Sequence, residues 1–185
     1  MATLADRCLD AFPSWLRSLS DDARALAALL EGGVGEGAGS VQARAAAALN
    51  YLFKSLDLIP DGLEDLGFID DAFVLRVAAE AVKLDGAEAL ATDATGTLAR
   101  LAEDAELIRE FLGDEYARLT RYVAGLEQGA ARGRSVAVIL SDSALRAEFV
   151  HEVQQWAEGY AVPSFTRDER NLVKLRAFLL AKLPA

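Results

Sequence analysis

Residues 52–75 read LFKSLDLIPDGLEDLGFIDDAFVL, a stretch that places six carboxylates between two apolar runs. Pro60 drives the residue before it away from the helical region, so a helix that starts near residue 40 must end before Ile59. Apolar residues return at helical spacing only after Gly67. The stretch therefore predicts two helices joined by an acidic turn, which together form a helical hairpin near residues 40–84.

Local backbone structure can account for most of these acids. Asp61 and Glu64 have the spacing of a capping box, which predicts a short turn of helix that ends at Gly67. Asp70 is expected to be the N-cap of the second helix. Asp71 is then its first residue, where the helix dipole favours an anion. On this interpretation the acids stabilise the turn and the helix ends, and they neither bind a metal nor take part in catalysis.

Asp57 is harder to explain, because it follows the first helix, whose C-terminal dipole disfavours a negative charge. One solution is that Asp57, Asp61, Asp70 and Asp71 converge on Mg²⁺ or Ca²⁺, since clustered carboxylates suit hard divalent cations. The spacing is not that of an EF-hand, and no histidine lies nearby. Three interpretations therefore stay open: helix caps and turn bonds, a metal site, or a surface for a protein partner.

The composition favours an all-helical protein. Of 185 residues, 52% are hydrophobic and 26% are charged, which is enough apolar material for a core. Alanine is abundant and strand-forming residues are sparse. The expected fold is all-α, a multi-helix bundle of about eight to ten helices. We expect residues 1–92, which include the hairpin, and residues 93–185 to pack as one domain.

Proline and glycine divide the first part of the chain. Pro13 is expected to break or kink a helix over residues 4–19, and Ser20 to cap a second helix that ends near Glu31. Residues 32–39 contain five glycines and are expected to form a connector. No strand pattern precedes them and no Gly-Lys-Ser/Thr follows, so a phosphate-binding loop is not supported.

The second part of the chain shows further helical patterns. Apolar residues between Leu98 and Leu126 recur at steps of three and four, which predicts core helices or a dimerising coiled coil, bent or broken at Gly113. The segment VAVIL, residues 136–140, is expected to be helical, because a lone strand has no partner. The sequence TRDE, residues 166–169, has the pattern of a capping box for the last helix.

The net charge, the single cysteine and the hydropathy pattern indicate where the protein is located and which partners it can have. The net charge of −10 argues against nucleic acid, because an acidic surface repels phosphates. One cysteine permits no internal disulfide, and no long uncharged apolar stretch is present. We therefore expect a cytoplasmic protein without a transmembrane segment. Arg167, Arg170 and Lys174 share one face of the last helix, which is either solvated, docked on the acidic stretch or weakly bound to anionic lipid.

No catalytic constellation accompanies the acids. His151 is the only histidine, and it lacks the second histidine of a metalloprotease helix. Ser141 and Ser143 lack the glycines of a nucleophile elbow, and Cys8 has no neighbouring base. We therefore expect a protein that is not an enzyme and has no cofactor.

The acidic stretch resembles the signature of the bacterial YkvA-like proteins, whose shared piece is a domain of unknown function. The residues that match in order are Asp57, Leu58, Ile59, Pro60, Asp61, Gly67, Phe68, Ile69, Asp70 and Asp71. The resemblance covers residues 48–82 and implies a small helical hairpin, without implying a reaction. Many relatives look membrane-associated, with a greasy helix after the two aspartates. Arg76, Glu80 and Lys83 interrupt that helix here, which fits a soluble version with a long helical C-terminal region.

The leading hypothesis is a non-enzymatic interaction or scaffold module, in which the acidic turn forms a surface for an unidentified protein partner. One alternative is a divalent-metal-binding protein or metal-dependent enzyme that uses the four aspartates. A second is a peripheral membrane protein that makes weak contacts with lipid. A homo-oligomer is compatible with each of them.

Overall fold

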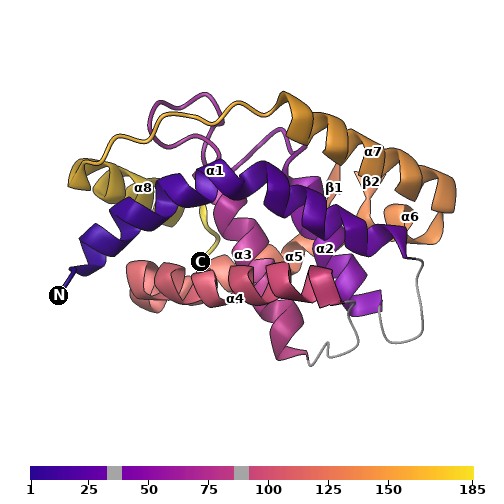
Figure 1. Cartoon of the computed structure of the whole chain (residues 1–185), viewed down its shortest axis with the longest axis horizontal. Coiled ribbons are helices and arrows are strands. Elements are labelled where there is room, and N and C mark those ends of the chain that lie inside the picture. The colour runs from indigo at the N-terminus through magenta and orange to yellow at the C-terminus, as the bar shows by residue number, and fades with distance from the viewer. Residues whose placement is uncertain (33–38, 86–91) are drawn as a thin grey trace.

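The computed structural model describes residues 1–32, 39–85 and 92–185 and shows an all-α bundle, as predicted (Figure 1). A 3-10 turn lies on each side of helix α5 (Tyr116–Gly125), at η1 (Gly113–Glu115) and η2 (Leu126–Gln128). A short hairpin, β1 (Ala130–Ala131) and β2 (Arg134–Ser135), precedes helix α6 (Val136–Ser141). The helices are α1 (Leu4–Glu31), α2 (Gly39–Tyr51), α3 (Ile69–Leu84), α4 (Thr92–Leu112), α5 (Tyr116–Gly125), α6 (Val136–Ser141), α7 (Ser143–Gly159) and α8 (Glu169–Lys182).

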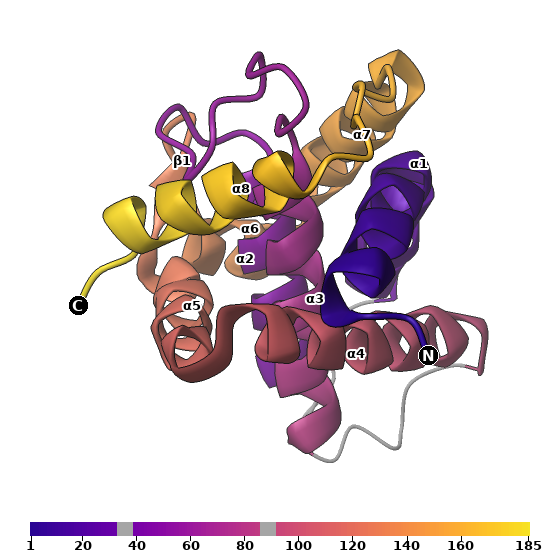
Figure 2. The ribbon, with the colours of Figure 1, turned by 90° about the vertical axis from the view of Figure 1, so that its left-hand side faces the viewer.

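α3 runs through the middle of the bundle (Figure 2). Every residue from Ile69 to Ala79 is buried, which is typical of a helix that is covered on all sides. α2 and α4 pack against α3, and α1 and α5 also contact it. The helical hairpin predicted near residues 40–84 is therefore confirmed as α2 and α3.

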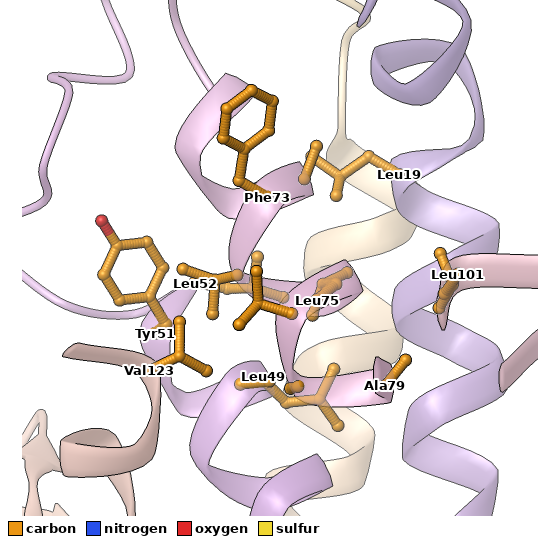
Figure 3. Close-up of a cluster of buried hydrophobic side chains, with 14 of the residues drawn as sticks. Leu19, Leu49, Tyr51, Leu52, Phe73, Leu75, Ala79, Leu101 and Val123 are labelled. Carbon is orange, nitrogen blue, oxygen red and sulfur yellow. The ribbon is translucent and has the colours of Figure 1, made fainter. Parts of the chain in front are cut away.

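Side chains from α1 to α5 meet in one buried cluster (Figure 3). The labelled members are Leu19, Leu49, Tyr51, Leu52, Phe73, Leu75, Ala79, Leu101 and Val123. The same core continues to Phe149 of α7 and Leu175 of α8. Residues from both halves of the sequence therefore contribute to it.

The prediction that Pro13 ends or kinks a first helix, with a new cap at Ser20, is wrong in its division of the chain. α1 is one helix with Pro13 inside it, and its capping box is formed by Thr3 and Asp6. A proline within a helix costs about 3 kcal/mol through a lost hydrogen bond and a clash. The buried stripe continues on both sides of the proline, from Leu9 to Leu30, and its packing outweighs that cost.

Other predictions concern the second half. Gly113 does break the apolar seam: its φ is +60°, and η1 separates α4 from α5. Residues 136–140 are helical, with Ser135 as N-cap, although residues 130–135 form a hairpin rather than a loop. Positive φ at Arg132 and Gly133 suits such a two-residue turn. The connector expected at residues 32–39 falls mainly outside the described residues.

Candidate functional site

The acidic loop, residues 52–68, joins α2 to α3 without any helix or strand. It is the purple trace at the margin of the helices in Figure 2. Its inner side is apolar, with Ile59 and Leu66 buried in the core. On its outer side, Leu56 is 83% exposed and Asp61 is also exposed. The loop therefore has one face fixed in the protein and one face directed to solvent.

Asp70, in the first turn of α3, anchors this loop from beneath. Its buried Oδ2 accepts hydrogen bonds from the Tyr51 hydroxyl at 2.6 Å and from the Ile59 backbone N–H at 3.0 Å. The Tyr51 oxygen in turn accepts a hydrogen bond from the Leu58 backbone N–H at 2.8 Å. Two side chains thus satisfy two buried amides of a segment that has no regular structure of its own.

A second set of contacts joins the acidic loop to the region of α7 and α8. Asp65, with φ +64°, accepts hydrogen bonds from the backbone N–H and the hydroxyl of Thr166 at 2.8 and 2.9 Å. The backbone hydrogen bond from Thr166 is the main cause that lowers the pKa of Asp65. The Phe68 ring packs against Trp156 and Tyr160. The loop is therefore attached at its centre, through Leu58 and Ile59, and towards its end, through Asp65 and Phe68.

Burial and like charge raise the pKa of the inner carboxyl groups. Burial raises the pKa of Asp57 to about 7, and the charges of Asp61 and Asp70 add to this effect. Burial raises the pKa of Asp70 to about 6, although its hydrogen bonds favour the ionised form. Asp71 is 2% exposed, and burial together with the charge of Asp70 raises its pKa well above the usual value. These groups therefore keep protons at a pH where exposed carboxyl groups are ionised.

The four aspartates proposed as metal ligands influence one another electrostatically, since, in addition to burial, the charges of Asp70, Asp61 and Asp57 raise the pKa of Asp71. Within residues 1–32, 39–85 and 92–185, three buried carboxyl oxygens have no hydrogen-bond partner: Asp57 Oδ1, Asp70 Oδ1 and Asp71 Oδ2. In the same ranges, no three His, Cys, Asp or Glu side chains are grouped so as to hold a metal ion. A buried carboxyl group without a counterion takes up a proton. Binding of Mg²⁺ or Ca²⁺ here stays a prediction.

The helix caps predicted for Asp61, Glu64 and Asp70 are wrong, whereas Asp71 does lie in the first turn of α3, two residues later than predicted. α3 begins at Ile69, so Asp70 and Asp71 lie within its first turn, and the carboxylate of Asp70 bonds to the loop as well as to its own backbone N–H. Asp61 and Glu64 form no capping box, because turns and not a helix follow them. The main partners of Asp70 are therefore the Tyr51 hydroxyl and the Ile59 N–H, which the spacing of the acids did not suggest.

Sequence reasoning also missed two residues that hold the loop, Tyr51 and Thr166. Tyr51 carried a signal: it closes the apolar face of a predicted helix, and a buried tyrosine hydroxyl needs a partner. For Thr166, the sequence indicated only a capping box with Glu169 at the start of the last helix. That prediction is wrong, because Asp168 caps α8 while Thr166 bonds to Asp65.

The basic face predicted near α8 does not hold the acidic loop. Arg167 pairs with Asp6 and Asp10 of α1. Arg170 and Lys174 are exposed. In the described part of the chain, the hydrogen bonds from this region to Asp65 come from Thr166, Ser164 and Asn171 and not from the basic side chains.

The remaining candidate groups show little chemical activation. His151 is exposed on α7. Cys8 is buried, and burial raises the pKa of its thiol to about 11, so it is a poor nucleophile at neutral pH. Over the ranges that the structure describes, each helix is too short or too polar to cross a lipid bilayer.

Comparison with known proteins singles out the same region. Residues 43–76 match the model of a family described as a protein of unknown function (DUF1232). The match contains the whole acidic loop together with Tyr51 and Asp70, and it covers less than half of the chain. No curated protein and no solved structure matches this chain.

Proposed function

We propose that this chain is a non-enzymatic interaction module that presents the acidic loop to a protein partner. The observation that carries the proposal is the buried Asp70–Tyr51 pair, which holds residues 52–68 in one conformation without secondary structure. Loops of this length are uncommon in compact domains and usually have a function. A loop that is ordered before binding also loses less conformational entropy when a partner binds.

The outer face of the loop indicates the chemistry of the partner. Leu56 is an exposed apolar side chain, and the exposed acids Asp61 and Glu64 lie on the same loop. A complementary surface has basic side chains around an apolar socket, because apolar anchors supply affinity and charge pairs supply specificity. We therefore expect a partner with a basic docking surface.

The test is a selection from a random peptide library on the immobilised protein. Selected peptides should carry Lys or Arg around one large apolar residue. They should bind the Leu56→Asp/Glu64→Lys double variant at least about tenfold more weakly, a loss of about 1.4 kcal/mol. The matched control is Val173→Asp, which changes a side chain of α8 that is 70% exposed. Peptides that bind the double variant as tightly as the wild type would overturn the proposal.

A second candidate function is a response to divalent cations. The unpartnered oxygens of Asp57, Asp70 and Asp71 favour it, because carboxylate oxygens are the ligands that Mg²⁺ and Ca²⁺ prefer. Thermal unfolding with EDTA, Mg²⁺ or Ca²⁺ tests it. A cation at about 100 times its dissociation constant should stabilise the wild type by about 2.7 kcal/mol and should stabilise Asp57→Asn less. Equal midpoints with EDTA and with each cation would exclude this function.

The matched segment supports a finer assignment, which we also propose: a YkvA-like domain in a cytoplasmic bacterial protein. Its support is the run from Asp57 to Asp61 followed, after a short spacer, by Gly67 to Asp71. Weak contact with anionic membranes stays a prediction, which co-sedimentation with anionic vesicles tests. A protein that stays in the supernatant would rule it out.

A further inference from the structure

A cavity of about 300 Å³ opens to solvent between α2, α5 and the β1–β2 hairpin. It lies beside the start of the acidic loop, since Tyr51 and Lys54 line it. Figure 3 shows Tyr51 at the edge of the buried cluster, next to Val123 of α5. Volumes of this size are at the lower end for small-molecule sites and suit a compound of one or two rings. The cavity is also lined by Ala47, Asn50, Arg121, Tyr122, Leu126 and Pro184.

Two basic side chains at this cavity have no carboxylate within ion-pair distance among the described residues. Lys54 donates a hydrogen bond to the Tyr122 hydroxyl at 2.9 Å, and Arg121 donates one to the Ala117 carbonyl at 3.4 Å. The charge of Lys54 also acts on Asp57, where it lowers the pKa and so opposes part of the rise that burial causes. The chain has 29 acidic and only 19 basic residues, so two cations without an ion pair at one cavity indicate an anionic ligand.

The walls of the cavity are aromatic and apolar. The Tyr51 and Tyr122 rings lie edge to face with centroids 6.2 Å apart, and Ala47, Leu126 and Pro184 extend the apolar lining. Tyr51 is 1% exposed, so Tyr122 is the ring of this pair that can receive a flat ligand through an edge or offset contact. Asn50, 4% exposed, keeps its Oδ1 without a hydrogen-bond partner in the described ranges, which is uncommon for a purely structural side chain.

We propose that this cavity binds a small aromatic anion: one or two planar rings that carry a carboxylate or a phosphate. The rings lie against Tyr122, Leu126 and Pro184, and the anionic group pairs with Lys54 and Arg121. This site is independent of the proposed interaction function, because it uses a different surface. A failed peptide selection therefore leaves it standing, and a failed ligand titration leaves the interaction function standing.

The experiment is a titration of the full chain with phenyl phosphate, followed through the backbone amide signals in NMR spectra. Saturable shifts are expected at Ala47, Tyr51 and Arg121. Arg121→Met and Lys54→Met keep an aliphatic stem and remove the charge, and each should weaken binding about tenfold or more. Arg17→Met, which changes an exposed arginine of α1, should bind like the wild type.

Two further probes separate the two requirements of the site: phenol has the ring without the charge, and inorganic phosphate has the charge without the ring. Phenol should bind much more weakly than phenyl phosphate, and inorganic phosphate should bind much more weakly as well. Equal binding of phenol would overturn the anion requirement, and equal binding of inorganic phosphate would overturn the aromatic one. Absence of saturable shifts with phenyl phosphate would overturn the site. If Lys54→Met disturbs the fold, Arg121→Met alone tests whether a basic side chain binds the anionic group, because Arg121 is exposed and its replacement should not affect folding.

Discussion

Arg76 is fully buried in α3 and is surrounded by partners from other helices. Its guanidinium donates a hydrogen bond to Asp104 of α4 at 3.1 Å, lies 3.5 Å from Asp22 of α1 and faces the Trp15 ring. Arg100 of α4 also pairs with Asp22. Burial lowers the pKa of Arg76 to about 10, which still leaves it charged at neutral pH. In the sequence Arg76 seems to interrupt an apolar helix, but in the structure it forms buried ion pairs with Asp22 and Asp104.

Replacement of Arg76 by leucine should destabilise the protein strongly. The change leaves Asp22 buried with less compensation, and loss of one partner from a buried pair costs about 3 kcal/mol or more. Urea denaturation followed by circular dichroism measures the free energy of unfolding. Arg24→Leu is the control, because Arg24 pairs with Asp21 at the surface and should cost no more than about 1 kcal/mol. Losses of similar size in both variants would contradict the role given to Arg76.

The raised pKa values of Asp57 and Asp70 predict a pH dependence of stability. These pKa values are about 7 and about 6 in the folded protein, whereas an unfolded aspartate titrates near 4. Between those limits the folded state holds more protons than the unfolded state, so stability is greatest at low pH in this window and falls as the pH rises.

The free energy of unfolding should therefore be larger at pH 5 than at pH 7.5. Each proton that the folded state holds in excess contributes a slope of at most about 1.4 kcal/mol per pH unit. Asp57→Asn carries a permanently neutral group and should flatten the dependence. Urea denaturation at the two pH values measures both effects. Stability that rises from pH 5 to 7.5, or a slope unchanged in the variant, would show that these carboxyl groups do not hold protons.

At the scale of the element, the acidic loop depends on a close approach of its own backbone. A Cβ atom at Gly67 would overlap the carbonyl group of Asp61, so only glycine fits there. The Gly67 N–H also donates a hydrogen bond to the Leu63 carbonyl at 2.8 Å. This position therefore determines how the loop folds back before α3 begins.

Gly67→Ala should lower the free energy of unfolding by about 2 kcal/mol or more, because the clash lies between backbone atoms that cannot turn aside. It should also speed hydrogen exchange at the Leu58 and Ile59 amides, which the loop conformation protects. Gly62→Ala is the matched control in the same loop, since a Cβ there meets no atom within 4 Å. Slow exchange retained in Gly67→Ala would mean that the backbone approach does not position the loop.

The sequence predicts those features of the elements that depend on neighbouring residues. The all-α class, the α2–α3 hairpin and the break at Gly113 follow from apolar spacing and from the backbone preferences of proline and glycine. Continuity of α1 through Pro13 and the use of Asp70 as a loop anchor do not follow, because both depend on contacts with distant segments. The charges of the four aspartates act on one another, but their protonation depends mainly on burial, which spacing does not encode.

At the scale of the whole molecule, the two halves of the sequence share an aromatic core. The Phe12 ring of α1 contacts Phe73 of α3, Phe111 of α4 and Phe165, which precedes α8. Such a core cannot be divided without exposing rings on both sides. We therefore expect residues 1–92 and 93–185 to unfold together.

The two tryptophans provide the test, because Trp15 lies in α1 and Trp156 in α7. Trp15→Phe and Trp156→Phe each leave one fluorescent reporter. In each variant, the urea midpoint from fluorescence should coincide with the midpoint from circular dichroism, as in a two-state transition. Separate midpoints in either variant would indicate two domains that unfold independently.

The packing of α1 against α7 also bears on how the chain is made. Tyr160, which follows α7, donates a hydrogen bond to the Leu16 carbonyl in α1 at 2.9 Å. A ribosome completes α1 before it makes α4 and α7, which pack against α1. The apolar stripe of α1 therefore stays partly uncovered until those two helices have been made, in the state that aggregates most readily and that chaperones protect. More than a hundred residues are translated between the end of α1 and the start of α7, at Ser143.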